Sequence, residues 1–205
     1  MRNELIIANN ASTLPDLISD SDGVITDFSS AFHSYMHDVL GLKPIANEPR
    51  SFDYSDVYPS YDSPAKHIKD FINNPDYFGD IGIYPEALIA LKKLHSAGVR
   101  ITIVTSIGDS PDVMRARLDL YNRELTGVVD DVIFLPFCSE KSETLKTFSR
   151  SIFIDDLIGE CVSATANGHD AFLFPRNYNR YASPSTGIKT LVNNWRSLPY
   201  FSQSI

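Results

Sequence analysis

The sequence lacks the features that mark secreted and membrane proteins. It has only two cysteines, Cys138 and Cys161, in 205 residues, and they form no paired metal-ligand motif. We expect both to be small buried residues in a reducing compartment. No apolar run approaches the length needed to cross a membrane, and residues 1–13 hold one short apolar run after an acidic residue, which is no signal peptide. We therefore expect a cytoplasmic protein with no membrane partner.

Basic residues are also scarce. The chain has 18 Lys and Arg against 26 Asp and Glu, so its formal net charge is -8. Because there is no excess of positive charge to neutralise phosphates, a nucleic-acid polymer is not an expected partner. Hydrophobic residues make up 43% of the chain, as is typical of a globular domain with a real core. An acidic protein that handles a small anionic substrate needs local positive charge, and a bound cation is the simplest source.

Two carboxylates follow the first apolar stretch. Leu17, Ile18 and Ser19 have the pattern of a buried strand, and Asp20-Ser21-Asp22-Gly23 comes directly after it. Side chains two apart on a strand share a face, so Asp20 and Asp22 begin side by side and repel each other. A cation or a proton must relieve this repulsion. The stretch therefore predicts a divalent metal site or an acid–base pair, and a solvated turn is the alternative.

A regular alternation of strands and helices follows this stretch. Apolar runs predict further strands at residues 99–104, 128–134, 151–154 and 171–174. Strands separated by helices are typical of an α/β fold with a doubly wound parallel sheet, covered by helices on both faces. The first two strands are about 70 residues apart, which is far more than one connecting helix needs. We expect residues 28–80 to be an inserted helical cap on an α/β core of residues 14–27 and 81–205.

Proline, glycine and serine suggest where the helices begin and end. The expected helices cover residues 28–40, 63–73 and 85–97, then a helix that starts at Ser110-Pro111-Asp112, and residues 139–148, 160–166 and 186–196. Ser63 is the expected N-cap of the second helix, which Pro75 closes. The fourth helix has the expected apolar residues Val113, Leu118 and Tyr121.

Polar residues recur where the predicted strands end. They are Thr105 and Ser106 after the second strand, Lys141 after the third, and Asp155 and Asp156 after the fourth. Ligands of open parallel sheets bind at the carboxyl ends of the strands, so these residues should meet Asp20 and Asp22 at one edge. Each also has an ordinary alternative: helix caps for the hydroxyls, a surface position for the lysine, and a turn for the acidic pair.

These pieces resemble, in order, the four signature motifs of the haloacid dehalogenase superfamily of phosphotransferases. The motifs are Asp20-Ser21-Asp22-Gly23-Val24, the strand ending in Thr105-Ser106, Lys141, and Phe153-Ile154-Asp155-Asp156. Within the superfamily the chain is most similar to 5'(3')-deoxyribonucleotidases, through Phe28, Val104-Thr105-Ser106 and residues 173–180. It departs from that group where Ile107-Gly108-Asp109 replaces a proline and a basic residue, and where Phe52-Asp53-Tyr54 replaces a tryptophan.

The resemblance implies a Mg2+-dependent phosphomonoesterase that forms an aspartyl-phosphate intermediate. Asp20 would be the nucleophile, and Asp22 the general acid and then the general base. Mg2+ would be held by Asp20, the backbone carbonyl of Asp22 and a carboxylate of the fourth strand. We expect Asp156 to be the direct ligand, with Asp155 holding Lys141 or a metal-bound water.

The same resemblance predicts the substrate contacts. Thr105, Ser106 and Lys141 would bind phosphate oxygens, and Asp22 would contact the leaving oxygen. The aromatic residues Phe28, Phe52 and Tyr54 are candidates to stack on a base, although packing of the cap against the core is the alternative. The expected substrate is a (deoxy)nucleoside 5'- or 3'-monophosphate. A sugar phosphate or other small metabolite, a non-catalytic phospho-ligand-binding regulator, and a homodimer all stay open.

Overall fold

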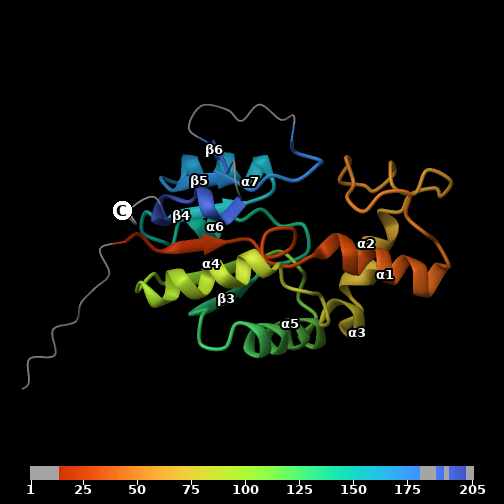
Figure 1. Cartoon of the computed structure of the whole chain (residues 1–205), viewed down its shortest axis with the longest axis horizontal. Helices are drawn as coiled ribbons and strands as arrows, with labels where there is room; N and C mark the ends of the chain where they lie inside the picture. The colour runs from red at the N-terminus through yellow and green to blue at the C-terminus, as the bar shows by residue number, and fades with distance from the viewer. Residues whose placement is uncertain (1–13, 181–187, 192–193, 202–205) are drawn as a thin grey trace, which may run out of the picture.

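A computed structural model describes residues 14–180, 188–191 and 194–201. Its strands form one parallel six-stranded sheet in the order β3-β2-β1-β4-β5-β6 (Figure 1). The strands are β1 (Leu17–Ser19), β2 (Ile101–Thr105), β3 (Asp131–Phe134), β4 (Ile152–Asp155), β5 (Asp170–Leu173) and β6 (Lys189–Thr190). The prediction of an α/β fold with a parallel sheet is confirmed.

The register of the central strands brings their carboxyl ends to one level. β1 lies between β2 and β4, and Ser19 is paired with Ile103 on one side and Ile154 on the other. The backbone N–H of Asp20 continues the ladder by donating to the Ile154 carbonyl at 2.8 Å. The residues that follow these strands therefore come out at the same edge of the sheet, in the place where ligands of such sheets bind.

Helices cover both faces of the sheet, as the sequence predicted. Leu17 and Ile103 belong to a cluster with buried residues of α4 (Pro85–Ser96) and α5 (Pro111–Glu124). Their neighbours Ile18 and Val104 belong to a second cluster, with α6 (Ser142–Leu145) and α7 (Ile158–Ala166). Adjacent residues of a strand point to opposite faces. Each such buried apolar side chain stabilises the fold by roughly 1.5–3 kcal/mol.

A helical region follows the first strand, again as expected. It contains α1 (Phe28–Leu40), α2 (Lys66–Ile72) and α3 (Pro75–Phe78), and α1 and α2 lie beyond one end of the sheet in Figure 1. The Asp27 side chain caps α1 by accepting from the Ser30 N–H at 3.1 Å, and Gly41 ends it at a φ of 67°. Aromatic side chains of all three helices, Phe32, Phe71 and Phe78, join the core cluster that covers α4 and α5.

Two expected helix boundaries in this region are wrong. Ser63 has a φ of 67°, which is not the extended backbone of an N-cap, and α2 begins only at Lys66. Pro75 does not close a helix but opens α3, where Asn74 is the N-cap and its side chain accepts from the Asp76 N–H. Proline is favoured at a first helical position because its missing N–H would have no helical partner there.

The helices expected at 139–148 and 186–196 are also wrong in part or whole. The first is reduced to α6, because the backbone before Ser142 is engaged by the side chains of Ser106 and Glu160. In the second, the described residues form β6 and a 3-10 helix, η1 (Asn194–Ser197), followed by η2 (Pro199–Phe201). Trp195 is buried against Phe174 with ring centroids 5.9 Å apart, and this tertiary contact overrides the helical pattern.

The buried face of α5 differs from the expected one at three positions, Arg117, Leu118 and Leu120. Its buried residues are Val113, Arg117, Leu120 and Tyr121. Leu118, which was assigned to the apolar face, is exposed. A charged residue, Arg117, therefore occupies a place in the core-facing stripe of this helix, and it is fully buried. Such burial requires a compensating partner.

The two cysteines lie in different surroundings. Cys161 is buried on α7, where its thiol contacts the Asp155 carbonyl at 3.6 Å. Cys138 is exposed in the loop after β3, so the expectation that it is buried is wrong. This loop turns through a bond from Ser139 N–H to the Pro136 carbonyl, which leaves Cys138 at the surface with a φ of 59°. Among the described residues, no helix is both long and apolar enough to cross a bilayer.

Candidate active site

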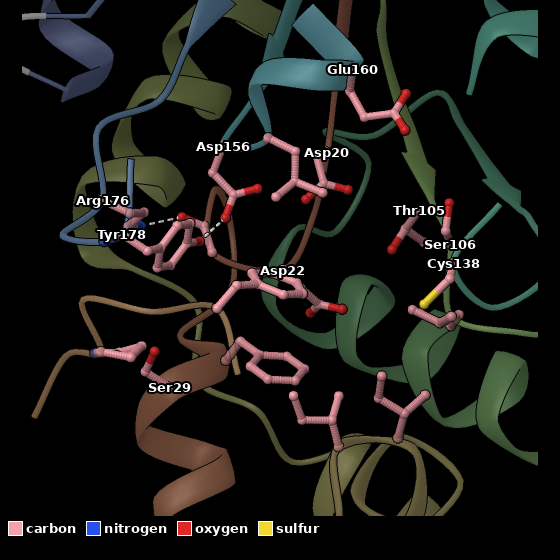
Figure 2. Close-up of a pocket in the computed structure, with 18 of the residues that line it drawn as sticks. Asp20, Asp22, Ser29, Thr105, Ser106, Cys138, Asp156, Glu160, Arg176 and Tyr178 are labelled. Atoms are coloured by element: carbon pink, nitrogen blue, oxygen red, sulfur yellow. Dashed lines mark hydrogen bonds between the residues drawn. The ribbon is translucent and has the colours of Figure 1, made fainter. Parts of the chain in front are cut away.

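Three aspartates meet at the carboxyl ends of β1 and β4. Asp20 follows β1, Asp155 ends β4 and Asp156 follows it, and each is at most 8% exposed. Each carboxylate offers one oxygen to a group in which all oxygens lie within 4.8 Å of one another. Figure 2 shows Asp20 and Asp156 close together on one side of the pocket. Three buried carboxylates at this spacing repel strongly unless positive charge lies among them.

Lys141 supplies one such charge. Its Nζ donates to Oδ1 of Asp20 at 2.5 Å and to Oδ2 of Asp155 at 2.6 Å. The lysine is buried, so the alternative of a solvated surface lysine is excluded. Burial alone would lower the pKa of Lys141, but the Asp155 and Asp20 carboxylates raise it above its ordinary range. The side chain is therefore an ammonium, and one positive charge faces three carboxylates.

The remaining excess of negative charge appears in the pKa values of the aspartates. Burial raises the pKa of Asp20 well above its ordinary value, although the Lys141 ammonium lowers it. Burial, followed by the charge of Asp155, raises the pKa of Asp156 to about 7. A divalent cation would relieve this repulsion better than a proton, and buried carboxylate oxygens are the ligands that Mg2+ prefers. The cluster therefore fits a Mg2+ site.

The hydrogen bonds distinguish the roles open to the three carboxylates. Both oxygens of Asp155 are engaged, Oδ2 by Lys141 and Oδ1 by the Leu157 N–H at 2.8 Å. Asp156 accepts a hydrogen bond at Oδ2 from the Tyr178 hydroxyl. Among the described residues, no hydrogen bond engages Oδ1 of Asp156. Asp156 and Asp20 thus have more capacity left for a metal than Asp155 has.

Asp22 lies outside this cluster. Its Oδ1 accepts from the Thr26 hydroxyl at 2.7 Å and forms an ion pair with a terminal guanidinium nitrogen of Arg117 at 2.9 Å. In Figure 2 it lies between the acidic cluster and α1. Arg117 was not among the predicted site residues, and its sequence signal is a charge at a core-facing position of α5.

Thr105 and Ser106 lie across the pocket from Asp156 (Figure 2). Thr105 ends β2 and is buried. The Ser106 hydroxyl donates to the Ser139 carbonyl at 2.8 Å, so it ties the loop after β2 to the loop after β3. All the residues predicted from the strand ends except Asp155 line the same pocket, and Asp155 reaches it through Lys141.

This pocket has a volume of about 260 Å3 and extends from the strand ends to the helical region after β1. Phe28, Phe52 and Tyr54 all line it. Phe28 packs edge-on against Phe71, with ring centroids 5.2 Å apart, and Tyr54 is buried with its hydroxyl 3.0 Å from the Ser29 hydroxyl. Phe52 is 56% exposed, so it is the most accessible of the three aromatic candidates.

Two further pocket residues, Arg176 and Tyr178, were not predicted as site residues. The Arg176 Nε donates to the Gly23 carbonyl at 2.5 Å, and its guanidinium lies 4.3 Å from the Tyr84 ring centroid. Tyr178 connects the acidic cluster to the helical region after β1, because its ring also meets Phe52 edge-on at 5.8 Å. Both belong to residues 173–180, whose likeness to the deoxyribonucleotidases was a signal that could have identified them.

No protein-family model matches the chain, and no curated protein matches its sequence. Solved structures do match in fold. A haloacid dehalogenase-like hydrolase, SP0104 from Streptococcus pneumoniae, has a TM-score of 0.58 and 15% identity over 92% of this chain and 98% of its own. The D,D-heptose 1,7-bisphosphate phosphatase from B. bronchiseptica, complexed with magnesium and phosphate, has a TM-score of 0.56 and 16% identity, covering 89% and 94%.

A dehalogenase also matches, with a TM-score of 0.54 and 15% identity over 89% of this chain and 94% of its own. Identities this low establish the fold alone. The chain therefore has the haloacid dehalogenase-like fold that its four motifs predicted, and proteins of this fold carry out more than one reaction. The likeness to deoxyribonucleotidases in particular has no support among these matches.

Proposed function

We propose that this protein is a Mg2+-dependent phosphomonoesterase whose nucleophile is Asp20. The observation that carries the proposal is the convergence of Asp20, Asp155 and Asp156 on the buried ammonium of Lys141. A buried site with three carboxylates and one cation has capacity for a divalent metal and, through that metal, for an anionic substrate. Among proteins of similar fold, the B. bronchiseptica phosphatase was crystallised with magnesium and phosphate.

Asp20 is the best-placed nucleophile. Its Oδ1 is held by Lys141, which fixes the orientation of the carboxylate at the end of β1. A carboxylate oxygen would attack the substrate phosphorus, and the bond between phosphorus and the leaving oxygen would break. Water would then attack the phosphorus, the bond to Asp20 would break, and inorganic phosphate would leave.

The metal would be held by the carboxylates of Asp20 and Asp156 and by the backbone carbonyl of Asp22, with Asp155 orienting Lys141. When bound, Mg2+ supplies positive charge that reduces the repulsion between the attacking carboxylate and the phosphate dianion. Thr105, Ser106 and Lys141 would bind the nonbridging phosphate oxygens. The Ser106 hydroxyl already donates to Ser139, so its backbone N–H is the donor better suited to phosphate.

Asp22 would be the general acid and base. It lines the pocket but lies outside the metal cluster, so its carboxyl group is available to the leaving oxygen. It would donate a proton to that oxygen in the first step and take one from water in the second. Proton donation suits an alkoxide leaving group such as that of a phosphate ester.

For the substrate we propose a nucleoside monophosphate, 5' or 3'. The support is the aromatic wall formed by Phe28, Phe52 and Tyr54, of which Phe52 is accessible for stacking on a base. A sugar phosphate would use the same catalytic residues and would need no aromatic wall.

The test is release of inorganic phosphate from nucleoside 5'- and 3'-monophosphates and from sugar phosphates, with Mg2+ or with EDTA. We expect turnover of at least one class with Mg2+ and none with EDTA. Asp20→Asn should abolish turnover, whereas Asp16→Asn, an exposed aspartate before β1, should leave it unchanged. Turnover of sugar phosphates alone would refute the nucleotide assignment, and no turnover of any ester would refute the phosphatase.

A further inference from the structure

We propose that Arg117 is a positioning residue that holds Asp22 ready for proton transfer to the leaving group. The inference rests on the proposed phosphatase function and adds a residue to it that none of the four motifs contains. Arg117 lies in the middle of α5, a helix that packs on one face of the sheet, and its side chain reaches Asp22 in the loop after β1.

Arg117 is fully buried, and its contacts are few. Among the described residues its one ion-pair partner is Asp22, with 2.9 Å between the charged groups. Its other terminal nitrogen donates to the Thr26 hydroxyl at 3.3 Å. Neither the Nε of Arg117 nor the terminal nitrogen that faces Asp22 has a hydrogen-bond partner in the described part of the chain, so Asp22 and Arg117 are joined by a close ion pair and not by an aligned hydrogen bond. A buried guanidinium with so little compensation depends on the Asp22 carboxylate, and the carboxylate is held in return.

The contacts are directed to one oxygen of Asp22. Arg117 and the Thr26 hydroxyl both meet Oδ1, and Thr26 is itself held by Arg117. Within the described residues, no hydrogen bond or ion pair engages Oδ2. The hydrogen bond from Thr26 and the charge of Arg117 act on the same oxygen, which restricts the rotation of the carboxyl group and leaves the second oxygen for the substrate. This is the arrangement that a proton donor at fixed distance from a leaving group needs.

The helical region after β1 also holds the Arg117 side chain in place. The Phe78 ring of α3 covers the Arg117 guanidinium at 3.9 Å from its centroid. The two helices are in close contact here, because a Cβ added at Gly79 would lie 2.7 Å from the Cβ of Ala116. Arg117 is thus held between the helical region after β1 and Asp22. A stacked guanidinium is also held in its plane, which an ammonium would not be.

A purely structural ion pair would give the same picture, so the test must separate the two roles. We compare two esters hydrolysed by the same enzyme: p-nitrophenyl phosphate, whose phenolate leaves without a proton, and the best alkyl phosphate of the substrate panel, whose alkoxide needs one. If Arg117 acts through Asp22, its loss slows the release of the leaving group, measured in a single turnover, only for the alkyl phosphate. The later hydrolysis of the aspartyl phosphate, in which Asp22 takes a proton from water, is common to both esters and is slowed equally. If it only stabilises the fold, both reactions suffer alike.

The variants are Arg117→Met, which removes the charge but keeps an unbranched side chain, and Arg117→Lys. Arg115→Met, an exposed arginine of the same helix, is the matched control. For Arg117→Met we expect the single-turnover rate of leaving-group release to fall by about 10² with the alkyl phosphate and by less than about threefold with p-nitrophenyl phosphate, since a positioned proton donor contributes about 10²–10⁴. Arg117→Lys should recover part of the loss, and Arg115→Met should match the wild type on both esters.

The double variant Asp22→Asn with Arg117→Met provides the second readout. We expect it to be no slower on the alkyl phosphate than Asp22→Asn alone, because Arg117 would act only through Asp22. Equal losses in the single-turnover rate of leaving-group release on both esters in folded Arg117→Met, or a multiplicative loss in the double variant, would overturn the inference and spare the phosphatase. A wild type that hydrolyses neither ester would overturn both.

Discussion

Oδ1 of Asp20 lies 2.5 Å from Nζ of Lys141, although 121 residues separate the two in the sequence. The lysine bridges Asp20 to Asp155, so a single ammonium joins the ends of two adjacent strands. The ammonium of Lys141 allows the acidic side chains to be buried together. Because one positive charge faces three carboxylates, the cluster keeps an excess of negative charge.

Replacing Lys141 should lower the stability of the protein, because the cluster would lose its buried ammonium. Lys141→Met leaves three buried carboxylates without a counter-ion, and breaking a buried ion pair in this way costs about 3–5 kcal/mol. We expect the free energy of unfolding, measured by urea denaturation at pH 8 in EDTA, to fall by about this amount. Lys146→Met, at an exposed lysine that pairs with Glu143, is the control and should change little. Equal stability of the two variants would show that Lys141 does not compensate the cluster.

The same excess of negative charge predicts how stability depends on pH. The pKa of Asp156 is raised to about 7, chiefly by burial, so between about pH 4 and 7 the folded protein binds a proton that the unfolded chain does not. Without metal, this contribution is complete below about pH 4 and is lost as the pH rises through 7, by up to about 1.4 kcal/mol per pH unit. Mg2+ competes with that proton, so its stabilising effect should grow over the same range.

Thermal unfolding from pH 5 to 8, with EDTA or Mg2+, measures both trends. Asp156→Asn is the control: it should reduce the pH dependence in EDTA, leaving the part that Asp20 contributes, and remove most of the stabilisation by Mg2+. A Mg2+ effect of the same size at pH 5 and pH 8 would contradict the raised pKa of Asp156.

Gly23 allows the loop after β1 to approach the cluster. Its φ is 83°, and a Cβ there would lie 2.4 Å from Oδ2 of Asp156. Gly23→Ala should therefore displace the Asp156 carboxylate and weaken Mg2+ binding, measured by calorimetry. Gly41→Ala is the matched control, because Gly41 also has a positive φ but a Cβ there meets nothing within 4 Å. Both variants carry roughly 1–2 kcal/mol of backbone strain, so a difference in Mg2+ affinity isolates the contact.

Much of the site could be predicted because it depends on strand ends. Short apolar runs located β1, β2 and β4, and the parallel arrangement then brought Asp20, Thr105 and Asp155 together without any knowledge of side-chain contacts. The remaining site residues could be predicted because parallel strands end at one edge of the sheet, and the polar residues that follow those strands must lie near one another there.

Arg117 could not be found in this way, because periodicity arguments assign core positions to apolar residues. The pattern on α5 favoured Leu118, whereas the structure buries Arg117 one position earlier. The burial of Arg117 is offset by Asp22 and Phe78, which are distant in sequence. The expected helix at 186–196 failed for a related reason, since Trp195 packs against Phe174 and tertiary contact prevails over local preference.

Phe52 tests the proposed nucleotide preference. It is exposed at the pocket, and stacking on a base is worth roughly 1–3 kcal/mol. Phe52→Ala should raise KM for nucleoside monophosphates by about tenfold and leave KM for a sugar phosphate unchanged. Ile45→Ala, at an apolar residue of the same region that is 71% exposed, should alter neither. Equal increases for both substrates would argue that Phe52 shapes the pocket and does not bind a base.

The most direct measurement is to stop turnover with acid in the presence of Mg2+ and to identify the phosphorylated residue by mass spectrometry. We predict that the phosphoryl group is found on Asp20, in the wild type but not in Asp20→Asn. Phosphate release that proceeds with no phosphorylated Asp20, or with the phosphoryl group on another residue, would contradict the account.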